Sequence, residues 1–80
     1  MRLDKFLKVS RLVKRRPIAK EMAEQGRVSV NDRVVKSSYD VQPGDIIAIN
    51  FGTRTLKAKV VELKQTTKKA EASQLYELID

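Results

Sequence analysis

Apolar residues recur every three or four positions over residues 2–9 and again between Pro17 and Gly26. This period is that of a helix with one buried face, so the pattern predicts two short amphipathic helices. Pro17 suits the first turn of the second helix, where its missing N–H costs nothing, and Gly26 would end it. The apolar positions are Leu3, Phe6, Leu7, Ile18, Ala19, Met22 and Ala23.

The apolar period becomes two after Gly26, which favours strands that bury one face. Asn31-Asp32 is typical of a tight hairpin turn, while Pro43-Gly44-Asp45 and Gly52-Thr53 mark two further turns. These signals predict four strands, over residues 27–30, 33–35, 46–51 and 55–63.

The tail from about residue 68 to residue 79 returns to the helical period, with Ala72, Leu75, Tyr76 and Ile79 in register. We therefore expect a closing helix there. The whole order predicts an α+β fold in which two N-terminal helices pack on a small antiparallel sheet, with a C-terminal helix. Eighty residues suffice for a single domain spanning 1–80.

The positive charge is concentrated at one end of the chain. Residues 1–36 hold eleven Lys or Arg and four acids, a net charge of +7, whereas residues 37–80 hold six of each sign. A one-signed field destabilises a compact chain by self-repulsion, but it suits a protein that binds polyanions and displaces their counterions. The pattern predicts a basic helical face over 1–36 that binds a polyanion, RNA among the candidates, supported by a neutral β-rich part and closing helix over 37–80.

Composition excludes several other classes of protein. The chain has no cysteine and no histidine, which rules out disulfides, thiol nucleophiles and the usual zinc and haem sites. No apolar run approaches the length of a signal peptide or a membrane-spanning helix. We therefore expect a cytoplasmic protein that is not an enzyme and has no metal, no cofactor and no membrane partner.

Four motifs in the first fifty residues resemble the RNA-binding domain named after ribosomal small-subunit protein four (the S4 domain). They are Arg2-Leu3-Asp4, Arg16 followed by Ala19-Lys20, Gly26-Arg27-Val28-Ser29-Val30-Asn31, and Val41-Gln42-Pro43-Gly44-Asp45-Ile46. The resemblance implies that the leading helices and the hairpin face RNA, with Arg2, Arg16 and Lys20 as the best contacts. Charge alone adds the neighbours Arg11, Lys14, Arg15 and Arg27.

Over its whole length the chain is similar to stand-alone S4-domain proteins of bacterial ribosome quality control, which are related to the fifteen-kilodalton heat-shock protein. This resemblance implies binding to the large ribosomal subunit obstructed by peptidyl-tRNA, with contacts to ribosomal RNA and the tRNA. We expect the chain to be a monomer. There it would assist a factor that adds a C-terminal alanine tail to the stalled chain. Two alternatives stay open: a general ribosomal-RNA-binding assembly or heat-shock factor without a tailing role, and an unselective polyanion binder.

Three local features have two interpretations. Asp4 either suits the start of a helix and pairs with Lys8, or orients Arg2 or another arginine. Arg15 stands where a Ser or Thr cap would stabilise the second helix by about 1 kcal/mol, which suggests a role in ligand binding. Lys68-Lys69 lie where the closing helix should begin, and the sequence does not decide whether they make a second contact with RNA or a partner.

Overall fold

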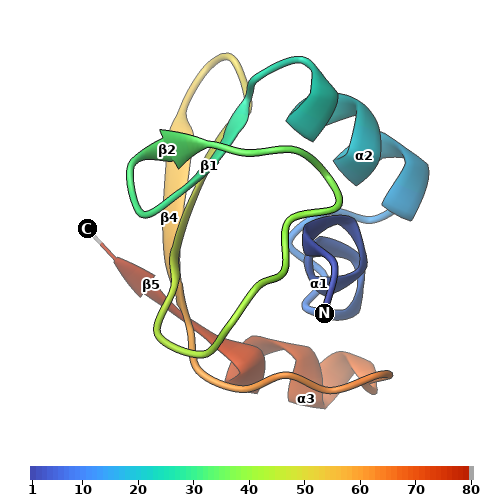
Figure 1. The fold of residues 1–80 in the computed structure, drawn as a ribbon. Helices are drawn as coiled ribbons and strands as arrows, with labels where there is room; N and C mark the ends of the chain where they lie inside the picture. Colours follow the sequence, from blue (N-terminus) through green and yellow to red (C-terminus); the bar gives the residue numbers. More distant parts are fainter. Residues whose placement is uncertain (80) are drawn as a thin grey trace.

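The computed structural model describes residues 1–79, and in it two helices lie side by side next to an antiparallel sheet (Figure 1). These helices are α1 (Leu3–Val9) and α2 (Arg16–Glu24). A third helix, α3 (Lys69–Ala72), continues into a 3₁₀ turn, η1 (Ser73–Leu75), beneath the sheet in this view. No helix in the described part is long and apolar enough to cross a membrane.

The sheet has five antiparallel strands in the order β2-β1-β3-β4-β5. Side chains on one face are buried and those on the other are more exposed, as the two-residue period predicts; Ile47 and Ile49, for example, are fully buried. The strands are β1 (Val28–Val30), β2 (Arg33–Val34), β3 (Ile46–Asn50), β4 (Thr55–Val60) and β5 (Tyr76–Ile79).

One hydrophobic core joins the helices to the sheet. Leu3, Phe6 and Leu7 project from the same face of α1 and are fully buried. They meet residues of α2, the inner face of the sheet and η1, so both ends of the sequence contribute to the same cluster. The other members are Val13, Ala19, Met22, Ala23, Val28, Val30, Val41, Ile47, Ile49, Val60 and Leu75. The predicted α+β class is confirmed.

The hairpin between β1 and β2 turns at Asn31 and Asp32, both with positive φ, at 52° and 68°. Asn31 stabilises this backbone through its side chain: the carbonyl oxygen accepts the N–H of Ile46 at 3.0 Å and the amide donates to Asp45 at 3.1 Å. Asp32 tolerates the left-handed region less well than glycine does. The predicted hairpin therefore forms without the usual glycine.

The predicted closing helix is wrong beyond Leu75. Residues 76–79 form β5, which pairs with β4 along its otherwise open edge, placing Leu78 opposite Ala58. Pairing with β4 satisfies backbone groups that an edge strand would leave open. Of the apolar face used to predict the helix, Ala72 and Leu75 are buried, but Ile79 is exposed.

Candidate nucleic-acid interface

The start of α1 is fixed by the loop over residues 36–41, which runs past it (Figure 1). The N–H groups of Leu3 and Asp4 donate to the carbonyls of Tyr39 (2.8 Å) and Ser37 (3.1 Å). The N–H of Lys5 donates to the Asp4 carboxylate at 2.8 Å. The first N–H groups of a helix have no partner inside it, so these bonds supply the missing acceptors. They hold Arg2 and Asp4 in place.

Asp4 is a buried carboxylate that contacts two arginines. Its side chain is only 3% exposed, whereas those of Arg2 and Arg16 are 49% and 46% exposed. Arg2 donates to both carboxylate oxygens at 3.2 Å, and Arg16 Nη2 lies 3.3 Å from Oδ1. Burial would raise the pKa of Asp4, but the hydrogen bonds from Arg2 and Lys5 and the charge of Arg16 hold that pKa below its ordinary value. Asp4 thus binds Arg2 and Arg16 as an anion.

The arginines held by Asp4 border a hollow of about 450 Å³, which we call the Asp4 hollow. It is lined by Arg2, Asp4, Arg16, Pro17 and Lys20. Arg16 and Lys20 are one turn apart on α2, while Arg2 comes from the start of α1, so packing of the two helices assembles the hollow. Two guanidinium groups with free edges and one ammonium group match the chemistry of a phosphate.

Arg11 and Lys14 lie elsewhere, in the connection between α1 and α2. With Lys8 and Lys69 they line a separate hollow of about 410 Å³, which we call the Lys69 hollow. The cations that the sequence placed on one basic face therefore divide between two hollows. The predicted neutral half also contributes a cation here, because Lys69 starts α3. Lys8 and Lys69 were missing from the predicted site.

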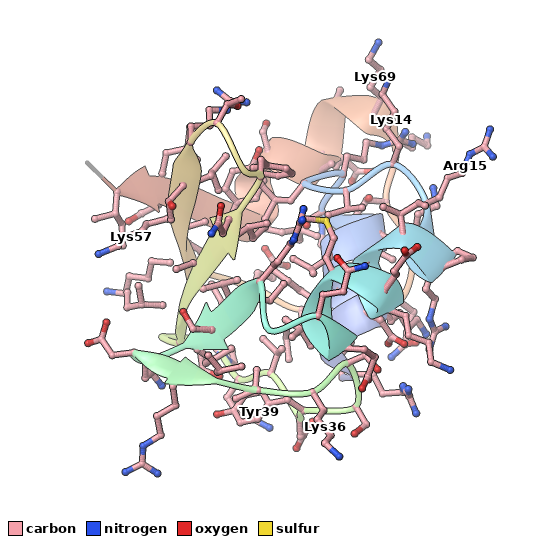
Figure 2. All side chains as sticks on the ribbon, turned by 90° about the horizontal axis from the view of Figure 1, so that it is seen from above. Lys14, Arg15, Lys36, Tyr39, Lys57 and Lys69 are labelled. Carbon is pink, nitrogen blue, oxygen red and sulfur yellow. The ribbon has the colours of Figure 1, made fainter. Side chains whose placement is uncertain are left out.

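Arg15 and Arg27 line neither hollow. Arg15 is the N-cap of α2 and makes no side-chain capping bond, as its residue type predicts. Its side chain points outward on the same side as Lys14 and Lys69 (Figure 2). Arg27 follows the other end of α2, where it is exposed and its carbonyl accepts the N–H of Asn50 at 2.8 Å.

No metal site accompanies these cations: within residues 1–79, no group of three or more acidic side chains could hold an ion. The chain has four aromatic residues. Phe6 is fully buried, and Tyr39, Phe51 and Tyr76 are partly buried against the core. The described surface therefore has no flat platform of exposed aromatic rings of the kind that stacks single-stranded bases. Its main feature is the cations that line the two hollows.

Comparison with known proteins agrees with this arrangement. A family model, the S4 domain, matches residues 1–47. These residues contain α1, α2, the β1–β2 hairpin and every residue that lines the Asp4 hollow. The chain therefore belongs to the RNA-binding S4 domain family, as the motifs predicted.

Several relatives match almost the whole chain. The RQC P-site tRNA stabilizing factor of Bacillus subtilis is 56% identical, over 99% of this chain and 92% of the relative. The protein of the same name from Streptococcus pneumoniae is 52% identical, over 99% and 90%. The solved structure of Vibrio cholerae Heat Shock Protein 15, described as trimeric, superposes with a TM-score of 0.92 at 31% identity, covering 99% of this chain and 81% of that one.

Proposed function

We propose that this chain is a ribosome-associated quality control factor that binds structured RNA through the Asp4 hollow. Arg2, Arg16 and Lys20 contact phosphates, and Asp4 orients the two arginines. The protein acts in the cytoplasm as a monomer, with no cofactor and no catalytic step of its own. Arg11, Lys14, Arg15 and Arg27 contribute further positive charge outside this hollow.

The observation that carries the proposal is the pair of arginines held by one buried carboxylate. Side-chain ordering on binding costs about 0.5–1.5 kcal/mol per long side chain, and Asp4 supplies part of that order beforehand. Each arginine side chain is still about half exposed, and its guanidinium carries five N–H donors, more than Asp4 engages. An arrangement of this kind suits a defined phosphate geometry better than it suits a diffuse polyanion.

The finer proposal concerns the RNA partner. The relatives that match the full chain are named for quality control and for stabilising tRNA in the P site. By analogy, this chain binds the large ribosomal subunit that still carries peptidyl-tRNA, contacting both ribosomal RNA and the tRNA. It thereby keeps the tRNA in place while a tailing factor on the same subunit adds alanine to the stalled nascent chain.

Sucrose-gradient sedimentation tests this proposal. The wild-type protein should co-migrate with large subunits that carry peptidyl-tRNA, and Arg2→Ala and Arg16→Ala should move it to the soluble fractions. Arg54→Ala is the matched control, because Arg54 lies over the Phe51 ring, 5.9 Å from its centroid, outside the Asp4 hollow. Retention of the Arg16→Ala variant on subunits would contradict the proposal.

A second candidate is a general ribosomal-RNA-binding factor of assembly or heat shock. It is favoured by the structural similarity to Heat Shock Protein 15, which extends over nearly the whole chain. This alternative predicts equal association with vacant and obstructed large subunits. The quality-control role predicts a strong preference for the obstructed ones, so sedimentation of the two purified forms separates the candidates.

A further inference from the structure

The Lys69 hollow is built from parts of the chain that are distant in sequence. Lys8 lies in the last turn of α1, Arg11 and Lys14 belong to the loop that follows, and Lys69 is the first residue of α3. The S4 domain model stops at residue 47, so this hollow extends beyond the matched domain. It shares no lining residue with the Asp4 hollow.

Specific contacts hold the two parts of the Lys69 hollow together. The Thr67 hydroxyl donates to the carbonyl of Val9 at the end of α1, and Lys5 donates to Gln65. Arg11 adopts a left-handed conformation, with φ at 61°, that only a few per cent of non-glycine residues use. A neighbouring depression, lined by Lys8, Val9, Arg11, Thr66 and Thr67, adds two hydroxyl groups to the same cationic surface.

The four cations of the Lys69 hollow have no anionic partner within the described residues. None of Lys8, Arg11, Lys14 and Lys69 forms an ion pair or a side-chain hydrogen bond in residues 1–79. The acid closest in sequence to Lys69 is Glu71, and its carboxylate is used by Lys64 at 3.8 Å and by the N–H of Lys68 at 3.3 Å. Four like charges around one hollow repel each other, and a bound polyanion relieves that repulsion.

We infer that the Lys69 hollow is a second RNA-binding site, which takes backbone phosphates of an RNA segment other than the one in the Asp4 hollow. RNA is favoured over an acidic peptide because the lining is cationic and hydroxyl-bearing, and because the rest of the surface belongs to an RNA-binding domain. For this choice of ligand the inference rests on the proposed function. The protein then binds RNA at two sites: the Asp4 hollow within the S4 domain, and the Lys69 hollow, which the C-terminal part completes.

Salt-dependent binding to a stem-loop RNA of about 16 base pairs, the length that a double-stranded-RNA-binding domain spans, tests the site. Lys14→Ser/Lys69→Ser should lower the slope of log affinity against log salt by about two, since each lysine lost removes about one phosphate contact. Lys57→Ser/Lys59→Ser removes the same charge from β4 and should leave the slope unchanged. Lys57 points away from Lys14 and Lys69 (Figure 2).

Each outcome decides a separate question. Equal slopes for the two double variants would overturn the second site. Loss of binding to a hexaglutamate peptide in Lys14→Ser/Lys69→Ser, with RNA binding intact, would overturn the assignment to RNA. If Arg2→Ala/Arg16→Ala binds like wild type while Lys14→Ser/Lys69→Ser does not, the Asp4 hollow fails and the Lys69 hollow stands. NMR shifts of the Thr67 and Lys69 amides on adding RNA should report the same contact without any substitution.

Discussion

Replacement of Asp4 by Asn separates orientation of the arginines from simple charge. The change keeps the size of the side chain and an oxygen that can accept a hydrogen bond from the N–H of Lys5. In the wild-type protein this bond, to Asp4 Oδ1, is 2.8 Å long. It removes the negative charge that holds Arg2 and Arg16, and it raises the net charge of the chain by one unit from +7. A diffuse electrostatic attraction to RNA would therefore become stronger, whereas binding that depends on oriented arginines should become weaker.

The structure gives the expected size of both effects. Hydrogen bonds to a charged group contribute about 1.5–3 kcal/mol, but both arginines are half exposed, so we expect a loss of about 1–2 kcal/mol in unfolding free energy. Ordering two released arginines on binding costs about 1–3 kcal/mol. The added charge offsets part of this cost. The net expectation is binding to RNA weaker by about five- to thirtyfold, at 1.4 kcal/mol per tenfold.

Fluorescence anisotropy with a labelled RNA stem-loop at about 0.1 M salt, where screening limits long-range effects, measures the affinity. Urea unfolding of the same preparations measures the stability. Glu77→Gln is the matched control: Glu77 is exposed on β5 and its replacement changes the charge equally. The reasoning is refuted if Asp4→Asn binds RNA as tightly as Glu77→Gln or more tightly.

Three further predictions concern stability and its coupling to binding. Arg15→Ser should add a cap to α2, raising the unfolding free energy by about 1 kcal/mol in urea while weakening RNA binding in the same anisotropy assay. The pKa of Asp4 lies below its ordinary 3.8, so its contribution to stability is complete above that pH and disappears as the pH falls through the lower folded value. Urea midpoints measured down to about pH 2 should therefore fall less steeply in Asp4→Asn. Leu75→Ala should cost about 2–5 kcal/mol, because this side chain is fully buried; a loss below about 1 kcal/mol would contradict its place in the core.

Most of the fold could be predicted because the information is local. The apolar spacing that begins at Leu3, the proline at the start of α2 and the turn at Asn31 each specify an element through their own residues. The tail shows the limit of this approach. Residues 76–79 carry apolar positions compatible with a helix, but the open edge of β4, distant in sequence, makes them a strand. Local periodicity contains no information about that edge.

The candidate site could be predicted in kind but not in arrangement. Charge and motif placed Arg2, Arg16 and Lys20 together, and the structure brings them to one hollow. Charge could not show that Lys69 lies beside the loop that contains Arg11, because the two parts meet through contacts such as that of Thr67 with Val9, almost sixty residues apart. Asp4 illustrates the same point: sequence left its partner open, and packing of α1 on α2 brings Arg16 to it.

The two hollows differ in how much of the molecule must be folded for each to exist. Every residue that lines the Asp4 hollow lies within the first twenty. Lys69, by contrast, reaches its position only when the C-terminal part has docked, with Leu75 buried and β5 added at an edge of the sheet. Terminal segments of a chain are among the first parts of a protein to open in native-state hydrogen exchange. Transient detachment of residues 61–79 would therefore release the RNA segment at the Lys69 hollow while the segment at the Asp4 hollow stays bound. The two RNA segments would then dissociate in a fixed order.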